Sequence, residues 1–341
     1  MRIATFNLES LDDRPDLDPP LERRIAVLRP QLLRLDADVL CLQEVNGQKP
    51  PEGGPRQLLA LERLLSGTPY AGFARVSTSR VSGPPSPPGA PRGVDPVHNL
   101  VILSRYPITR WAEPRHALVP PPTYRPVTAD PPEPAPEPVQ WDRPLLYAGI
   151  ELPGGRRLHV LNLHLRAPLA APVRGQKVDA ATWRTVGGWA EGFFIATMKR
   201  TGQALEARLV IERIFDREPE ALITVCGDFN AEERQMPLRT LRGDPGDTGN
   251  PALAARALEP IEHAVPPARR YSVIHGGRRQ MLDHMLVSSA LRAYCRGVEV
   301  DNEGLTDELT DTGPWSHHAP LIATFALPSC PDRSTAGDHV L

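Results

Sequence analysis

The sequence has few cysteines and no excess of either charge, and each of these absences excludes a class of protein. The four cysteines among 341 residues lie far apart and form no Cys-x-x-Cys pair. This spacing argues against a structural zinc site and gives no disulfide framework, so a reducing compartment fits best. Lysine and arginine number 39 against 41 aspartates and glutamates, a net charge of −2. The chain therefore lacks the basic excess that supplies sequence-independent affinity for nucleic-acid phosphates, although a local basic groove is still compatible with it.

The sequence also lacks a long apolar run and an N-terminal leader. Met1 is followed directly by the strand-like segment 2–8, and nowhere do eighteen uncharged apolar residues follow one another. We expect a cytoplasmic protein made without a signal. With 40% hydrophobic residues the chain can bury a sizeable core, and no repeat of 20 to 50 residues is visible.

Proline, by contrast, is abundant, and its 40 residues gather in two segments, 82–96 and 119–138. Proline lacks the amide hydrogen and fixes φ, so these segments cannot sustain a helix or a central strand. The residues on either side are strand-like, which predicts exposed loops inserted between strands of one sheet. We therefore expect a single domain over residues 1–328, followed by a polar tail over 329–341.

Strand and helix patterns alternate along the rest of the chain. Leucine and isoleucine recur at helical spacing over 21–35, between the strand-like segments 2–8 and 37–45. The later strand-like segments are 156–165, 221–230, 280–288 and 319–327. A helical pattern over 182–216 is interrupted at Gly187 and Gly188, and we expect a helical insertion over 167–200. This order predicts an α/β fold in which two sheets pack face to face with helices outside.

Acids, amides and histidines fall at the ends of the predicted strands. The candidates are Asn7, Glu44, His164, Asp228, Asn230, Asp283, His317 and His318. Each alone has a simpler role, such as a turn residue, a cap or a packed histidine. Because strand ends converge on one sheet edge, distant residues can meet there, and oxygen-rich groups with histidines are what divalent-cation phosphate chemistry requires.

Seven motifs in this order resemble one known family. They are "FNLES", "LCLQEV", "HNLVILSRYPI", "LNLHL", "GDFNAE", "LDHMLVS" and "SHHAPLIATF". Together they closely resemble the endonuclease/exonuclease/phosphatase superfamily, whose members are deoxyribonuclease I-like. The resemblance implies a four-layer α/β sandwich with two central mixed sheets and an active site at one sheet edge. It also implies Mg²⁺- or Mn²⁺-dependent hydrolysis of a phosphodiester or phosphomonoester.

The resemblance also assigns roles to the oxygen-bearing residues. Glu44 matches the family's glutamate metal ligand, and Asn7 matches the asparagine beside it. Asp228 and Asn230 match the pair that positions the attacking water and the phosphate. A carboxylate within reach of water is also a sensible general base.

The histidines match the family less uniformly. His164 matches a histidine that contacts the phosphate or the leaving group, and His318 matches the terminal histidine of a Ser-Asp-His motif. Asp283 matches the aspartate that hydrogen-bonds this histidine and would favour its protonated form. His317, however, stands where the family has aspartate.

This exchange of a carboxylate for an imidazole bears on the metal. One negative charge fewer should weaken Mg²⁺ binding and favour metals that accept nitrogen, so we predict Mg²⁺ or Mn²⁺ dependence with Mn²⁺ preferred. Two alternatives remain. Glu44 alone anchors the metal while His317 is merely tolerated, or the chain is a catalytically impaired binding or scaffold protein on the same fold.

Two further features bear on the substrate, which we expect to be a phosphate ester, with nucleic acid not favoured by the net charge. Arg143 precedes a strand near the predicted site, where it could hold a phosphate or form a surface ion pair. Segment 167–200 carries several aromatics among cations. They could stack bases, enter a lipid surface or cover a small phosphate. In the simpler interpretation Trp183, Val186, Trp189 and Phe193 bury one helix face against the body.

Overall fold

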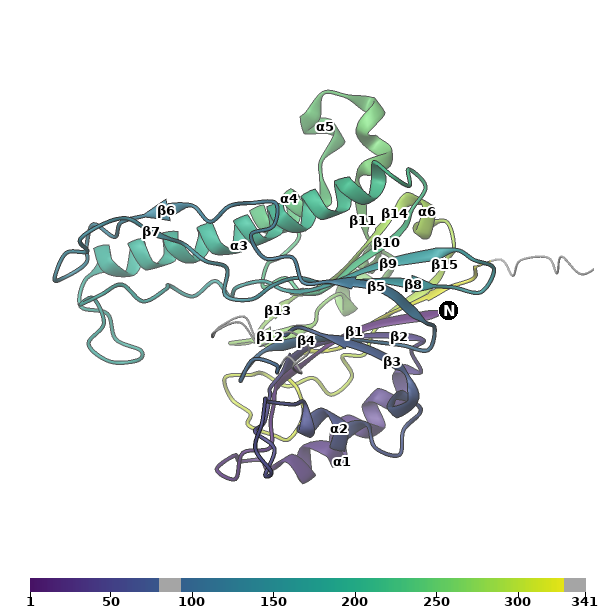
Figure 1. Ribbon diagram of the computed structural model, residues 1–341, viewed down its shortest axis with the longest axis horizontal. Coiled ribbons are helices and arrows are strands. Elements are labelled where there is room, and N and C mark those ends of the chain that lie inside the picture. Colours follow the sequence, from purple (N-terminus) through teal and green to yellow (C-terminus); the bar gives the residue numbers. More distant parts are fainter. Residues whose placement is uncertain (80–92, 328–341) are drawn as a thin grey trace, which may run out of the picture.

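The computed structural model describes residues 1–79 and 93–327, where two six-stranded sheets pack face to face (Figure 1). The first sheet has the order β15-β16-β1-β2-β4-β3. Its strands are β15 (Cys295–Val300), β16 (Leu321–Phe325), β1 (Arg2–Leu11), β2 (Val39–Val45), β4 (Asn99–Ser104) and β3 (Ala74–Ser77). β1 and β2 pair in parallel and the other neighbours are antiparallel, so the sheet is mixed.

The second sheet has the order β11-β14-β10-β9-β8-β5 and is also mixed, with β9 and β10 in parallel. Its strands are β11 (Leu258–Pro260), β14 (Asp283–Ser288), β10 (Leu222–Asp228), β9 (Arg157–His164), β8 (Leu146–Glu151) and β5 (Ile108–Ala112). Two short ladders lie outside the sheets. They are β6 (Thr123–Tyr124) with β7 (Glu137–Pro138), and β12 (Val273–His275) with β13 (Arg278–Gln280).

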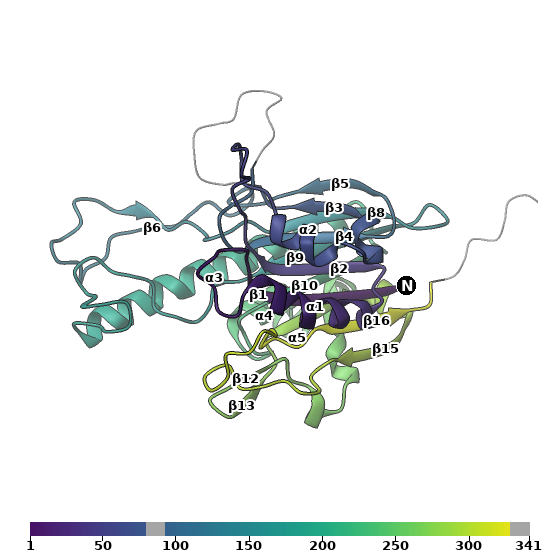
Figure 2. The same cartoon turned by 90° about the horizontal axis from the view of Figure 1, so that it is seen from below.

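Helices cover the outer face of each sheet, as Figures 1 and 2 show. The α-helices are α1 (Leu21–Leu35), α2 (Leu59–Leu65), α3 (Val186–Phe215), α4 (Met236–Arg242), α5 (Pro245–Thr248) and α6 (Ser289–Arg292). The short 3₁₀ turns are η1 (Pro69–Gly72), η2 (Pro251–Arg256), η3 (Ile261–Ala264) and η4 (Pro267–Arg269). α1 and α2 lie on the first sheet, while α3 and α4 lie on the second. The predicted four-layer α/β sandwich is therefore confirmed.

The layers follow from the apolar pattern of the strands. Alternate residues of each central strand face opposite sides of the sheet. On β9, Leu158 and Val160 enter the core between the sheets, whereas Leu161 and Leu163 pack under the outer helices. Both faces of the central strands are thus buried, which explains their nearly continuous apolar sequences.

The long helix differs from its prediction. α3 is continuous from Val186 to Phe215, so Gly187 and Gly188 lie in its first turn and interrupt nothing, and residues 167–185 are not helical. Thr185 caps the start by accepting a hydrogen bond from the Gly188 amide at 2.9 Å. A Cβ on Gly188 would lie 2.4 Å from Oε1 of Gln176, so glycine is needed for close packing of the preceding loop. From the sequence alone a glycine pair predicts a helix break, because the sequence does not show packing contacts of this kind.

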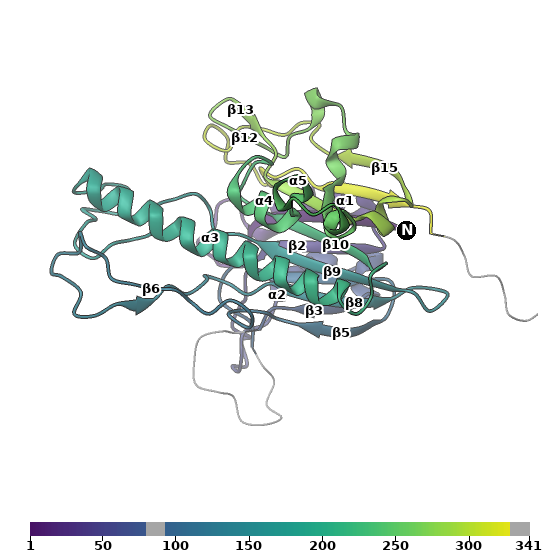
Figure 3. The same cartoon turned by 90° about the horizontal axis from the view of Figure 1, so that it is seen from above.

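The N-terminal half of α3 projects beyond the sheets together with β6 and β7, and we call residues 119–139 and 167–198 the arm (Figures 1 and 3). The arm has a small core of its own that includes Val139, Val173 and Ile195. The expectation that Val186, Trp189 and Phe193 bury a helix face against the body is wrong. Val186 is 81% exposed and Trp189 46%, because the helix extends past the body that would have covered them.

The proline-rich segments fall partly outside what the structure describes. Most of 82–96 and the predicted tail over 329–341 lie outside the described residues. Segment 119–138 is irregular apart from the two-residue strands β6 and β7, in line with the loop prediction. Within the described part of the chain, no helix combines the length and apolarity that crossing a bilayer requires. The cytoplasmic location stays a prediction.

Candidate active site

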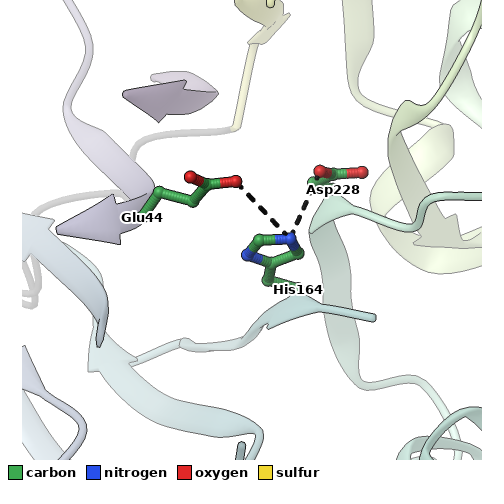
Figure 4. Close-up of side chains that lie close together, drawn as sticks. All are labelled: Glu44, His164 and Asp228. Carbon is green, nitrogen blue, oxygen red and sulfur yellow. Dashed lines mark ion pairs between the residues drawn. The ribbon is translucent and has the colours of Figure 1, made fainter. Parts of the chain in front are cut away.

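Strand register brings three predicted residues into one row at the edge of the second sheet. In the ladders, Asp228 at the end of β10 pairs with His164 at the end of β9 and with Asp283 at the start of β14. Because β14 runs antiparallel to β10, the beginning of one strand lies beside the end of the other. Figure 4 shows His164 between Asp228 and Glu44, which comes from the first sheet.

Glu44 reaches this edge through an irregularity in β2. Its φ is 57°, and the pairing of β2 with β4 shifts register between Leu42 and Val45. Asn7, fully buried on β1, donates from Nδ2 to Oε1 of Glu44 and to Oδ2 of Asp228, both at 3.1 Å. Burial would raise the pKa of Glu44, but nearby His98, Asn7 and His318 outweigh it and hold that pKa below its usual value. Glu44 is therefore ionised at neutral pH.

Asp228 is oriented by amides on both of its oxygens. Oδ1 accepts from the Asn230 backbone amide at 2.8 Å, and Oδ2 accepts from Nδ2 of Asn230 at 3.1 Å. Asn230 has a φ of 47°, which turns its side chain back toward the strand end. Burial, together with the charges of Asp283 and Glu44, raises the pKa of Asp228 to about 7 although His318 acts against the rise. The carboxyl can thus take up or release a proton near neutral pH.

His318 and Asp283 form a buried ion pair. Nδ1 of His318 lies 2.7 Å from Oδ2 of Asp283, which is 1% exposed. Burial alone would lower the pKa of His318, but the charge and hydrogen bond of Asp283 raise it to about 10. His318 is cationic at neutral pH, so its side chain is a hydrogen-bond donor and not a metal ligand.

His164 is the neutral member of the group. Nε2 lies 3.7 Å from Oε1 of Glu44 and 3.5 Å from Oδ2 of Asp228, while Nδ1 is buried and has no hydrogen-bond partner among the described residues. Burial holds the pKa of His164 well below its usual value, and the charge of Arg143 adds to this effect. A buried imidazole nitrogen without a partner is costly in free energy.

Sequence reasoning assigned no role to His98, although this residue opens the quoted motif "HNLVILSRYPI". Nε2 of His98 lies 3.7 Å from Oε2 of Glu44, and its ring centroid lies 5.8 Å from that of His164. Its φ of 59° turns it toward the edge just before β4 begins. The only signal available was its position at the start of a predicted strand, where a histidine is otherwise unremarkable.

Arg143 lies at the same edge, on the segment that leads into β8. Its Nη1 is buried and makes no hydrogen bond among the described residues, while its charge acts on Glu44 and Asp228. Burial lowers the pKa of this guanidinium, but from so high a starting value that it stays charged. Of the two predicted roles, a surface ion pair does not form in the described part of the chain.

His317 lies apart from Glu44. Its Nδ1 is 2.9 Å from the carboxylate of Glu9, whose Oε2 also accepts from the His317 backbone amide at 2.7 Å. Nε2 of His317 is buried and makes no hydrogen bond within the described part of the chain. Sequence analysis missed Glu9, which lies in the irregular part of β1 after Asn7 and has a φ of 48°. Its carboxylate restores at this position the negative charge that the histidine removes.

A divalent cation fits the donor atoms at this edge. Two groups of side chains bring ligand atoms within 4.8 Å of one another, namely Glu44, His164 and Asp228, and Asp228, Asp283 and His318. The second contains a protonated histidine already paired with Asp283, so the first is the better cation site. The raised pKa of Asp228 shows that its charge is poorly compensated, which a cation would relieve. Neither group includes His317, and its role as a ligand stays a prediction.

Comparison with known proteins agrees with this geometry. Solved structures of similar fold include Caenorhabditis elegans TDP2 (13% identity, TM-score 0.55, covering 95% of this chain and 96% of that one). A mannosyl-6-phosphatase from Bacteroides thetaiotaomicron has 15% identity and a TM-score of 0.54, covering 96% and 100%. An AP endonuclease from Archaeoglobus fulgidus has 16% identity and a TM-score of 0.50, also covering 96% and 100%.

These identities establish a shared fold and not a shared substrate. No significant match was found among curated proteins. The sequence model described as the Endonuclease/Exonuclease/phosphatase family matches residues 4–339, which is nearly the whole chain. With the two sheets in place and the acids and histidines at one edge, the chain belongs to the endonuclease/exonuclease/phosphatase family.

Proposed function

We propose that the protein is a divalent-metal-dependent phosphoesterase that hydrolyses a phosphodiester bond by attack of water. The observation that carries the proposal is the row of His164, Asp228 and Asp283 on adjacent strands, with His318 held against Asp283. This row brings a carboxyl with a pKa of about 7 close to a histidine with a pKa of about 10. A general base and a cationic donor are thereby available together near neutral pH.

Each group has a distinct task. Asp228, fixed by Asn230 and Asn7, accepts the proton of the attacking water. Protonated His318 donates a hydrogen bond to the phosphate, where negative charge develops, and Asp283 keeps it charged. Arg143 presents a buried nitrogen without a partner, which suits a phosphate oxygen, and neutral His164 completes the pocket wall.

Glu44, to which Asn7 donates a hydrogen bond, would hold the cation beside Asp228, and the cation would supply Lewis-acid polarisation of the phosphoryl oxygen. We propose Mg²⁺ or Mn²⁺, with Mn²⁺ preferred because His317 offers an unpaired Nε2 while its Nδ1 is held by Glu9. A ligating histidine ordinarily has a carboxylate on its other nitrogen in this way. Titration of metal-free protein tests the preference, and activation by Mg²⁺ equal to or better than that by Mn²⁺ contradicts it.

Hydrolysis of bis-p-nitrophenyl phosphate with and without added metal tests the activity. We expect Glu44→Ala and His318→Ala each to lower the rate by at least about a hundredfold. Glu259→Ala on β11 and His263→Ala are matched controls, since both side chains are largely exposed and lie outside the proposed site. Equal rates in all variants would support the non-catalytic binding protein instead. A faster rate on p-nitrophenyl phosphate would assign the enzyme to monoesters.

Action on DNA or RNA is a second candidate, favoured by the arm. α3 passes the site where Arg200 donates to the Asn230 carbonyl oxygen at 2.8 Å, and beyond that point Trp189 and Phe194 are about half exposed. Exposed aromatic rings beside a phosphoesterase site can stack bases of a single strand. Cleavage of a single-stranded oligonucleotide that falls with Trp189→Ala, while bis-p-nitrophenyl phosphate hydrolysis does not, would support this candidate.

A further inference from the structure

A second polar site lies on the outer face of the second sheet, away from the catalytic edge. A cavity of about 660 Å³ opens between β5, β8, β9 and the C-terminal end of α3. Figure 3 shows α3 crossing over these strands. His159 of β9 lines the cavity, five residues before His164 on the same strand, which corresponds to roughly 17 Å of extended chain. An odd spacing places the two histidines on opposite faces of the sheet, so the cavity is separate from the proposed active site.

A hydrogen-bonded relay forms the floor of this cavity. Nδ1 of His159 lies 2.9 Å from the Tyr147 hydroxyl, and Nε2 lies 3.1 Å from Oε2 of Glu218. Oε1 of Glu218 in turn accepts from Arg157 at 3.1 Å. His159 is only 4% exposed. The sheet face around it is otherwise packed with apolar side chains, so a buried polar relay here is costly unless something uses it.

Three arginines line the same cavity: Arg110 from β5, Arg213 from the last turn of α3, and Arg217 from the turn that follows it. Within residues 1–79 and 93–327, none of them makes a side-chain hydrogen bond or an ion pair. Glu218, the carboxylate in the lining, is already paired with Arg157 and His159. The lining therefore has an uncompensated positive charge that attracts anions.

Apolar side chains form the remaining wall. Leu118, Val210 and Ile214 line the cavity. An apolar wall beside guanidinium groups that have no partner among the described residues suits an apolar body that carries an anionic group. The volume lies within the range of pockets that hold small organic ligands.

We propose that this cavity binds a small organic anion, with its phosphate or carboxylate group among Arg110, Arg213 and Arg217 and its apolar body against Leu118, Val210 and Ile214. This site lies beyond the catalytic edge and does not depend on phosphoester hydrolysis there.

Calorimetric titration of the full chain with 2-naphthalenesulfonate, a non-hydrolysable aromatic anion, tests the proposal. We expect saturable 1:1 binding that weakens about tenfold in Arg213→Gln and in Arg217→Gln. Leu118→Ala should weaken binding of 2-naphthalenesulfonate but not of inorganic phosphate. Arg292→Gln, an exposed arginine paired with Glu259, is the matched control and should bind as the wild type does.

Two further variants distinguish binding in this cavity from binding at the proposed active site. Glu44→Ala should bind 2-naphthalenesulfonate normally, and Arg213→Gln should hydrolyse bis-p-nitrophenyl phosphate at the wild-type rate. Unchanged affinity in both arginine variants, equal affinity for neutral 2-naphthol, or loss of binding in Glu44→Ala would each overturn the proposal. Absence of saturable binding into the millimolar range would overturn it as well. These outcomes hold whether or not the protein proves to be a phosphoesterase.

Discussion

Strand β9 carries a buried histidine near each end, and the two have different neighbours. His164 lies between the carboxylates of Glu44 and Asp228, whereas His159 lies between Tyr147 and Glu218 in a cavity lined by unpaired arginines. Burial lowers the pKa of both. Burial therefore does not distinguish them, and the charge around each does. One end of the strand is built to attract a cation and the other an anion.

The largest expected effect is at the carboxylate end. Asp228→Asn removes the proposed base and should lower the rate of bis-p-nitrophenyl phosphate hydrolysis by about a thousandfold. It should also remove the acid limb of the pH profile, where the wild-type rate rises as Asp228 deprotonates at about pH 7, or lower once a cation is bound. Steady-state rates across pH provide the measurement, and Asp247→Asn on α5 is the control. A variant that keeps the acid limb would assign the base to another residue.

Asp283→Asn should have the next largest effect. The wild-type rate should fall as pH rises through about 10, where His318 loses its proton. Without the charge and hydrogen bond of Asp283 the pKa of His318 falls, although Asp228 and Glu44 still raise it, so fewer molecules carry the charge at pH 8. The alkaline limb should move to lower pH and the rate at pH 6 should recover in part. An alkaline limb that stays in place would exclude His318 as its origin.

His317→Asp should change metal preference more than rate. Adding a carboxylate beside Glu9 puts two negative charges close together and should raise affinity for Mg²⁺ relative to Mn²⁺ by about tenfold. Metal titrations of activity, and calorimetry with each metal alone, measure the ratio. An unchanged ratio would mean that His317 is a tolerated neighbour and that Glu44 anchors the cation without it.

The smallest effect on catalysis is expected at the other end of β9. His159→Gln should leave hydrolysis within about twofold of wild type, while losing contacts to Tyr147 and Glu218 should lower the free energy of unfolding by about 1 kcal/mol. Thermal melts and rates on one preparation test both parts. A large loss of activity at normal stability would contradict the independence of the two sites, because it would show that the two ends of β9 are coupled.

Much of the sheet edge that holds the candidate site could be predicted from the sequence because regular strands determine it. An apolar run that ends in an acid or a histidine, as at His164 and Asp228, predicts both the strand and the edge where that residue lies. Asp283 is harder to place, since it begins its strand, and only an antiparallel partner brings it beside Asp228.

The residues that were missed lie where the backbone is irregular. Glu9 and His98 both have positive φ, and their directions depend on turns that no periodicity encodes. The exposure of Trp189 could not be predicted from the apolar pattern either, because the pattern is the same whether or not the rest of the domain packs against that helix face. The arginine-lined cavity joins β5 to a helix a hundred residues later, and only the tertiary fold brings them together.

The register of β9, β10 and β14 has a consequence for how such a chain can diverge. Lengthening a surface loop leaves the ladder pairing untouched and so preserves the site. Deleting one residue inside β10 would turn every side chain between the deletion and the end of the strand, including Asp228, to the opposite face of the sheet. Contacts between residues more than 300 positions apart, such as the hydrogen bond from the Ser316 hydroxyl to the Asn7 carbonyl oxygen, also require strands of fixed length. This fold can thus accept an added arm or loop, whereas the length of its central strands must stay constant for the site to form.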